Sequence, residues 1–111
     1  YDVYGPPPPS SGGTCLVLML NMLEHFELKK HPRYSPTTLH LMIESMRLAY
    51  ADRARHLGDP AFTQIPAHLT TKEYADKLVK RINPDKATPS AQVAKDIDVI
   101  QEGDSTTHFS I

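Results

Sequence analysis

Apolar residues recur at helical spacing in three stretches of this chain. The first stretch begins near Gly12 and continues to Phe26, and its apolar residues surround the helix axis. Such a helix must be buried, but it is shorter than the ~20 residues that a membrane span needs, so we expect a core helix. The second stretch begins at Ser35-Pro36, where Ser35 suits the N-cap and Pro36 suits the first helical position. It predicts one apolar face made of Leu39, Ile43, Met46, Tyr50 and Ala54.

Turn-forming residues divide the second helix from the third. Gly58 and Pro60 predict the end of the second helix. The run Thr70-Thr71-Lys72-Glu73 offers a capping box for a third helix, which is predicted to end at Asn83-Pro84. On this helix one apolar face is expected, made of Tyr74, Leu78 and Ile82.

The two ends of the chain lack helical spacing. Gly5 and the prolines at 6–9 predict an extended, polyproline-like lead-in. Residues 84–104 are polar and without sustained periodicity, which predicts an exposed, mobile loop. Residues 106–111 are rich in β-branched and aromatic types and suit the first strand of a sheet. The expected fold class is therefore mostly α, with about three helices and short terminal strands, in a single partial domain over residues 1–111.

Composition narrows the function classes. The 111 residues are 40% hydrophobic and 23% charged, which is ordinary for a globular protein. The formal net charge of −1 provides no positive field to attract nucleic acid, so no nucleic-acid partner is expected. Cys15 is the only cysteine, which excludes an internal disulfide and a cysteine-based zinc site. The chain begins at Tyr1 without an initiator Met or a targeting signal, so we expect a piece of a longer polypeptide. No metal or cofactor is expected, because no helical zinc-ligand spacing occurs among His25, His31, His40, His56, His68 and His108.

Two polar constellations have ordinary structural explanations. Ser10-Ser11-Gly12-Gly13 before a helix can offer N–H groups to an anion, but it lacks a phosphate-loop ending and fits a plain helix start. A second group, near the end of the long helix, fits a solvated face with weak ion pairs better than a polar site. It consists of Asp52, Arg53, Arg55, His56 and Asp59.

A hydroxyl nucleophile beside a self-cleavage point is the sharper hypothesis, and it concerns the last residues of the chain. If the bond between Ser105 and Thr106 is cut, Thr106 carries both a hydroxyl and a free α-amine that can serve as its base. Composition alone leaves a plain β-strand as the commoner explanation of Thr106-Thr107.

Separated motifs in this order resemble the γ-glutamyltranspeptidase (glutathione hydrolase) family. They are Pro7-Pro8-Pro9-Ser10-Ser11-Gly12-Gly13, Tyr50-Ala51-Asp52-Arg53 with Leu57-Gly58-Asp59-Pro60, and Thr106-Thr107-His108-Phe109-Ser110. Their order and spacing match from Tyr4 to Ile111. The resemblance implies an N-terminal nucleophile hydrolase with an α-β-β-α sandwich as the parent fold.

The resemblance also implies site residues and partners. Residues 1–105 correspond to the end of a large subunit and residues 106–111 to the start of a small one, with self-cleavage between Ser105 and Thr106. Thr106 then forms a γ-glutamyl ester from glutathione or another γ-glutamyl compound, and water or an amino-acid or peptide acceptor takes the acyl group. The family is typically periplasmic, secreted or at the cell surface.

Other readings stay open beside this one. The resemblance implies that the substrate-carboxylate arginine and the oxyanion donors lie outside these residues, so we expect the 111 residues alone to be inactive. We also expect them to self-associate through apolar surface. The alternatives are a related acylase with another acyl substrate and a non-enzymatic helical interaction module.

Overall fold

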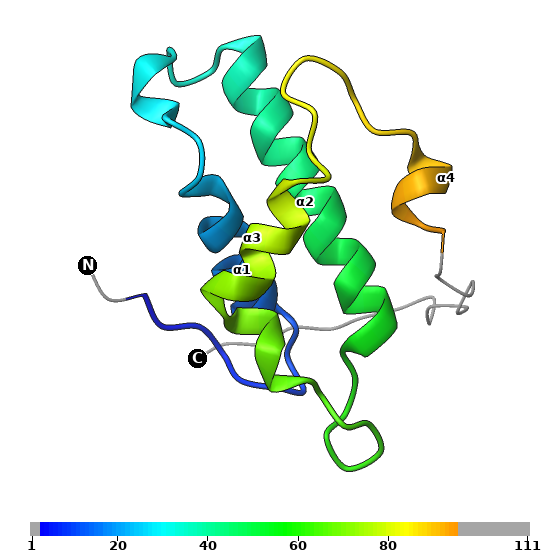
Figure 1. Ribbon diagram of the computed structural model, residues 1–111. Coiled ribbons are helices and arrows are strands. Elements are labelled where there is room, and N and C mark those ends of the chain that lie inside the picture. Colours follow the sequence, from blue (N-terminus) through cyan, green and yellow to red (C-terminus); the bar gives the residue numbers. More distant parts are fainter. Residues whose placement is uncertain (1–2, 96–111) are drawn as a thin grey trace.

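A computed structural model describes residues 3–95 and shows a mostly helical fold, as predicted (Figure 1). No strand is present among these residues, and the strand expected at 106–111 lies outside them. The four α-helices are α1 (Gly12–Leu23), α2 (Pro36–His56), α3 (Lys72–Val79) and α4 (Ser90–Val93). Two 3₁₀ turns, at Leu28–Lys30 and Ala67–Thr70, add to the three helices that the sequence predicts.

The long helix α2 is the central element. Helix α1 packs against both α2 and α3, and α4 lies beside α2 on the other side in the view of Figure 1. Most of the buried apolar side chains form one cluster that joins all four helices. Its members are Leu18, Met22, Leu41, Leu48, Ala49, Ala51, Ala75, Leu78, Ile82 and Val93.

Local capping explains where α2 and α3 begin. The hydroxyl of Ser35 accepts a hydrogen bond from the backbone N–H of Thr38 at 3.2 Å, and Pro36 occupies the first helical position, as predicted. At α3 the N-cap is Thr71, whose hydroxyl accepts from the N–H of Tyr74 at 3.3 Å. The predicted start is therefore confirmed, but no capping box forms, because the third residue after this cap is Tyr74 instead of a glutamate.

The entry to α1 depends on two glycines in close contact. The proline run is not fully extended, because it turns back with Ser10 N–H bonded to the Pro7 carbonyl at 3.2 Å. This turn brings Gly5 against Gly13, where an added Cβ on Gly13 would lie 2.4 Å from the carbonyl oxygen of Pro6. Only a residue without a side chain fits there.

Burial of the first two helices differs from the sequence prediction. On α1, Leu16 and Leu20 are 40% and 39% exposed, so this helix is buried on one side only among the described residues. On α2 the predicted apolar face points outward, and polar residues lie on the buried side with Leu41 and Leu48. The outward residues include Leu39, Ile43, Met46 and Tyr50, which are 41–53% exposed.

The region predicted to be a mobile loop contains structure in its first half. Residues Ser90–Val93 form α4, and Val93 is buried in the core cluster. This part of the chain is therefore fixed against α2, while residues 96–104 of the predicted loop lie outside the described range. Between residues 3 and 95, no helix has both the length and the hydropathy needed to cross a membrane.

Candidate functional site

The predicted nucleophile and its cleavage point, Thr106 and Ser105, lie outside the described residues. What the structure shows is the approach to them. Residues 88–93, which we name the anchored segment, run beside α2 and precede the predicted cleavage point in the chain. Two buried polar networks hold this segment.

Glu44 forms the centre of the first network. Its side chain is 2% exposed in the middle of α2, and its carboxylate accepts from Arg47 Nη1 at 2.5 Å and from the backbone N–H of Thr88 at 3.2 Å. Arg47 Nη2 also donates to the Ser90 hydroxyl at 3.1 Å. Burial by itself would raise the pKa of Glu44, but hydrogen bonds from Thr88 and Arg47, together with the Arg47 charge, outweigh it and lower the pKa. The carboxylate is thus ionised. It holds the start of the anchored segment directly at Thr88 and indirectly through Arg47 at Ser90.

Asp52 forms the centre of the second network, one end of which reaches α3. It is 3% exposed and accepts from the Tyr74 hydroxyl at 2.8 Å and from Arg55 Nη1 at 3.2 Å. Arg55 Nη2 donates to the carbonyl of Val93 at 3.2 Å. Burial, the hydrogen bond to Asp52 and the charge of Asp52 raise the pKa of Tyr74 to about 12. A continuous polar chain therefore runs from α3 through α2 to the last residue of α4.

These contacts correct the expectation of a solvated charged face at the end of α2. Asp52 and Arg55 do pair at i, i+3, but their side chains are 4% and 17% exposed. Arg53 Nε donates to the Ser11 hydroxyl at 3.2 Å, so the motif before α1 and the motif on α2 are joined. Asp59 accepts from the backbone N–H of Ala61 at 2.9 Å and closes the turn after α2. In the second motif, Asp52 and Arg53 thus connect elements, whereas Asp59 stabilises a local turn.

Cys15 lies buried on α1 near the same group. Burial raises the pKa of its thiol; the Arg53 charge opposes this and the Asp52 charge adds to it. The net effect is a protonated thiol, which is a poor nucleophile.

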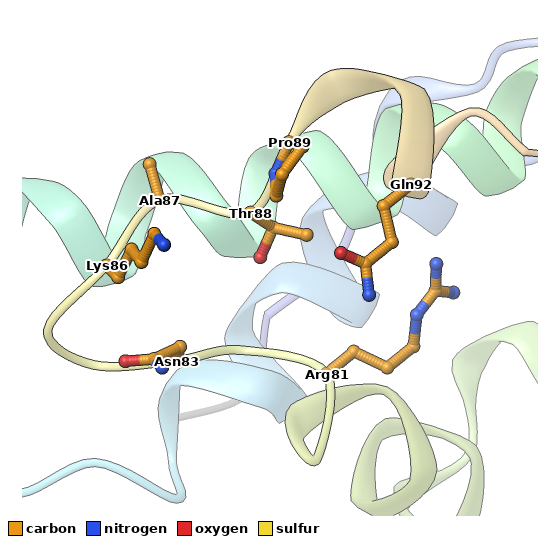
Figure 2. Close-up of a pocket in the computed structure, with 7 residues that line it drawn as sticks. All are labelled: Arg81, Asn83, Lys86, Ala87, Thr88, Pro89 and Gln92. Carbon is orange, nitrogen blue, oxygen red and sulfur yellow. The ribbon is translucent and has the colours of Figure 1, made fainter.

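A surface hollow of about 290 Å³ separates the end of α3 from the start of the anchored segment (Figure 2). Arg81 and Asn83 border it on the α3 side, and Lys86, Thr88 and Gln92 border it on the other. Figure 2 shows the Arg81 and Gln92 side chains extending toward one another across it. Among the described residues, its lining includes no histidine, cysteine or carboxylate that could activate the Thr88 hydroxyl.

Several of the histidines make pairwise structural contacts. His40 Nε2 donates to the Asn83 carbonyl at 2.8 Å, and His25 Nε2 lies 2.9 Å from the Asp76 carboxylate. The His68 ring contacts the Tyr74 ring edge-on, with centroids 4.6 Å apart. Within residues 3–95, no three His, Cys, Asp or Glu side chains gather as a metal site would require.

Sequence reasoning missed Glu44, Arg47 and Tyr74 as members of these networks. The partner of Glu44 is 44 positions away at Thr88, and the partner of Tyr74 is 22 positions away at Asp52. The i, i+3 spacing of Glu44 and Arg47 is a local signal for that pair, but the pattern of a single helix carries no signal for the two distant contacts.

Comparison with known proteins identifies the family. A sequence model described as Gamma-glutamyltranspeptidase matches residues 1–111, which is the whole chain. The chain belongs to the γ-glutamyltranspeptidase family. The resemblance drawn from the proline–glycine, α2 and C-terminal motifs is therefore confirmed.

Relatives with known names are similar over most of this chain. The glutathione hydrolase proenzyme of Escherichia coli is 42% identical over 112 residues, covering 100% of this chain and 19% of the proenzyme. An acylase ACY 1 proenzyme of Pseudomonas is 41% identical over 88 residues, covering 78% of this chain and 16% of that protein. The chain thus spans about a fifth of the length of these relatives.

A solved member of the γ-glutamyltranspeptidase family has the same arrangement. The crystal structure of Helicobacter pylori gamma-glutamyltranspeptidase matches with a TM-score of 0.80 and 38% identity, over 95% of this chain and 30% of that one. The helical arrangement of residues 3–95 is therefore a family feature.

Proposed function

We propose that this chain is part of a γ-glutamyltransferase or glutathione hydrolase precursor that cuts itself between Ser105 and Thr106. The observation that carries the proposal is the family match, which extends through residue 111 and so includes both residues. The names of the similar glutathione hydrolases, which are proenzymes, support a processing step.

In the proposed processing step, the Thr106 hydroxyl attacks the carbonyl carbon of Ser105. The peptide bond shifts to an ester on the Thr106 oxygen, which releases the α-amine, and water then hydrolyses the ester. Residues 1–105 end one subunit and residues 106–111 begin the other. The new α-amine, with an ordinary pKa near ~7.7–8.0, is suited to accept the hydroxyl proton at neutral pH.

In the proposed turnover, Thr106 attacks the γ-glutamyl carbonyl of glutathione or a related amide. A γ-glutamyl ester forms on the Thr106 oxygen, and the amine product leaves with a proton. Water or the amine of an amino acid or peptide then takes the acyl group. No cofactor enters this sequence.

The test is the mass of the full-length precursor with Thr106→Ala and, as a matched control, Thr107→Ala. Thr106→Ala is expected to stay uncut and to lose turnover of a γ-glutamyl anilide, because it lacks the hydroxyl. Thr107→Ala is expected to be cut at Ser105–Thr106, since its neighbour supplies the nucleophile. Cleavage at the same bond in Thr106→Ala would refute the assignment.

A second candidate is an acylase that keeps the Thr106 chemistry but accepts another acyl group. The match to the ACY 1 acylase proenzyme, at 41% identity over 78% of this chain, favours it specifically. A panel of γ-glutamyl and glutaryl amides presented to the processed protein separates the two. The matches to glutathione hydrolase and acylase proenzymes do not support the third hypothesis, a non-enzymatic helical interaction module.

We also propose that the 111 residues are inactive and self-associate when isolated. Exposed apolar side chains on α2, including Met46 at 44% and Tyr50 at 53%, support association. Light scattering of the isolated chain, with a γ-glutamyl anilide assay, tests both statements, and an active monomer would contradict them.

A further inference from the structure

The outward side of α2 carries an unbroken stripe of large apolar side chains, which we name the outer stripe. Its members, all 41–53% exposed, are Leu39, Met42, Ile43, Met46 and Tyr50. Steps of three and four residues place them on one face of the helix. Over residues 37–56 every exposed residue of α2 belongs to this stripe, because the charged residues of the helix are buried or half-buried.

The outer stripe cannot be buried by rotation of α2. An ordinary surface helix turns its charged residues to water, but here the carboxylates of Glu44 and Asp52 lie on the buried side, at 2% and 3% exposure. Glu44 accepts a hydrogen bond from Thr88, and Asp52 accepts one from Tyr74. A rotation that buried the stripe would break both bonds, so the stripe is a fixed surface. Contiguous exposed apolar patches of this kind mark contacts with other protein.

A surface hollow of about 280 Å³ between α2 and α4 continues the outer stripe. Tyr50 borders the hollow on the side of the stripe, and Ala51, Val93 and Ala94 add to its apolar lining. A segment that lies along α2 therefore meets a row of projecting side chains and then a depression. The two features together form one surface with a defined shape.

The size of the outer stripe bears on the kind of partner that it fits. Five large side chains at about half exposure present about 400 Å² of apolar surface. A stable complex of separate proteins buries about 800 Å² on each partner and must offset the loss of free translation and rotation. The stripe alone is thus too small for a stable dimer of this chain. A segment of the same polypeptide has already lost that freedom, so a surface of this size suffices to hold it.

Most of the polypeptide that could cover the outer stripe lies outside these residues. The chain covers 19% of the Escherichia coli proenzyme and 30% of the solved Helicobacter pylori chain, whose helical arrangement it shares. Under the proposed function, the subunit that contains α2 ends at Ser105. The remainder of that subunit then precedes Tyr1.

We propose that the outer stripe and the adjoining hollow form the surface on which the part of the large subunit before Tyr1 packs. The side of that segment that faces α2 is apolar, because the only polar side-chain group of the stripe is the Tyr50 hydroxyl. The inference rests on the proposed function, which assigns the segment to the large subunit. It also explains the proposed self-association of the isolated chain, in which the stripe is left uncovered.

Methionine oxidation in the full-length processed protein tests whether the outer stripe is covered. Met42 and Met46 belong to the stripe, and Met22, which is 0% exposed, is an internal standard for a buried methionine. With hydrogen peroxide, Met42 and Met46 are expected to oxidise at least about tenfold more slowly in the folded protein than in urea, as Met22 does, because a covered thioether reacts only after local opening. Oxidation of either residue at close to its rate in urea would overturn the inference. This test needs no substitution, so it holds even if a variant fails to fold.

Photo-cross-linking identifies what covers the outer stripe. Ile43 is replaced by p-benzoylphenylalanine in the full-length precursor, and the processed protein is irradiated, separated into subunits and analysed by mass spectrometry of its peptides. Attachment within the large subunit, to peptides that precede Tyr1, is expected. Attachment to the small subunit, or to a second copy with a yield that falls on dilution, would overturn the inference.

A matched control places the same photo-reactive residue at Tyr34, which is 73% exposed and lies outside the outer stripe. An isolated exposed aromatic residue is ordinary protein surface, so little attachment is expected there. Equal attachment of the same peptides from Tyr34 and Ile43 would contradict the assignment of the contact to the stripe. The intact masses of these samples report processing separately. A precursor that stays uncut would refute the proposed function, and its cross-link at Ile43 would still show whether residues before Tyr1 cover the stripe.

Discussion

The hydrogen bond from Tyr74 to Asp52 ties α3 to α2, and its removal by Tyr74→Phe has a predictable cost. The bond is 2.8 Å long and ends on a carboxylate that is 3% exposed. Hydrogen bonds to charged groups contribute about 1.5–3 kcal/mol. A second route starts from the Tyr74 pKa, which burial first and then the bond to Asp52 raise from 10.0 to about 12. At ~1.36 kcal/mol per pKa unit the whole shift corresponds to ~2.7 kcal/mol, which is an upper limit for the bond because burial is the larger cause.

Solvent screening reduces that upper limit, because the Tyr74 side chain is only partly buried. We therefore expect Tyr74→Phe to cost about 1.5 kcal/mol, which corresponds to a roughly tenfold rise in local opening of α3. Hydrogen exchange of the full-length protein at neutral pH, followed by mass spectrometry of peptides from α3, measures that opening. Amide exchange in Lys72–Val79 is expected to be about tenfold faster in the variant.

The matched control is Tyr34→Phe, because Tyr34 is 73% exposed and lies far from α3 in sequence. Exposed substitutions change stability by roughly 0.5 kcal/mol or less, so α3 exchange is expected to stay as in the natural protein. If Tyr74→Phe and Tyr34→Phe exchange alike in α3, the bond contributes nothing and the reasoning from burial and pKa fails.

The raised pKa of Tyr74, caused first by burial and then by the bond to Asp52, predicts a dependence on pH with a definite sign. The folded-state pKa of Tyr74 is raised, so its contribution is complete below about pH 10 and is lost as the pH rises toward about 12. The melting temperature of the natural protein should therefore approach that of Tyr74→Phe across this window. A difference that stays constant up to about pH 12 would contradict the raised pKa of Tyr74.

Two further predictions concern α1. Gly13→Ala is expected to destabilise the full-length protein by about 1–3 kcal/mol, because its Cβ would meet the Pro6 carbonyl oxygen at 2.4 Å. The Cβ of Gly12→Ala has no contact under 3.6 Å, so this control should be nearly neutral. Melting temperatures compare the two variants, and equal losses of stability would contradict the contact. Cys15, which is 6% exposed with a raised thiol pKa, is expected to react with iodoacetamide at least about tenfold more slowly in the folded protein than in urea; equal rates would contradict its burial.

Local signals in the sequence were enough to place the starts of α2 and α3. Ser35 with Pro36 and the threonines before Lys72 predict helix starts because a cap depends only on residues within one turn. The 3₁₀ turns and α4 were missed for the opposite reason. Helix α4 has four residues and no side-chain cap, so little in its own sequence predicts it, and contacts with α2 hold it in place.

The buried side of α2 could not be predicted from the periodicity of its apolar residues. Apolar residues occur on both sides of this helix, since Leu41 and Leu48 face the core while Ile43 and Tyr50 are each 53% exposed. Periodicity identifies an apolar stripe but does not say which element of the chain covers it. Polar residues decide the orientation here, because Glu44 can be buried only where Thr88 supplies a partner. That partner comes from a distant segment, so the fold must be known before the buried side can be assigned.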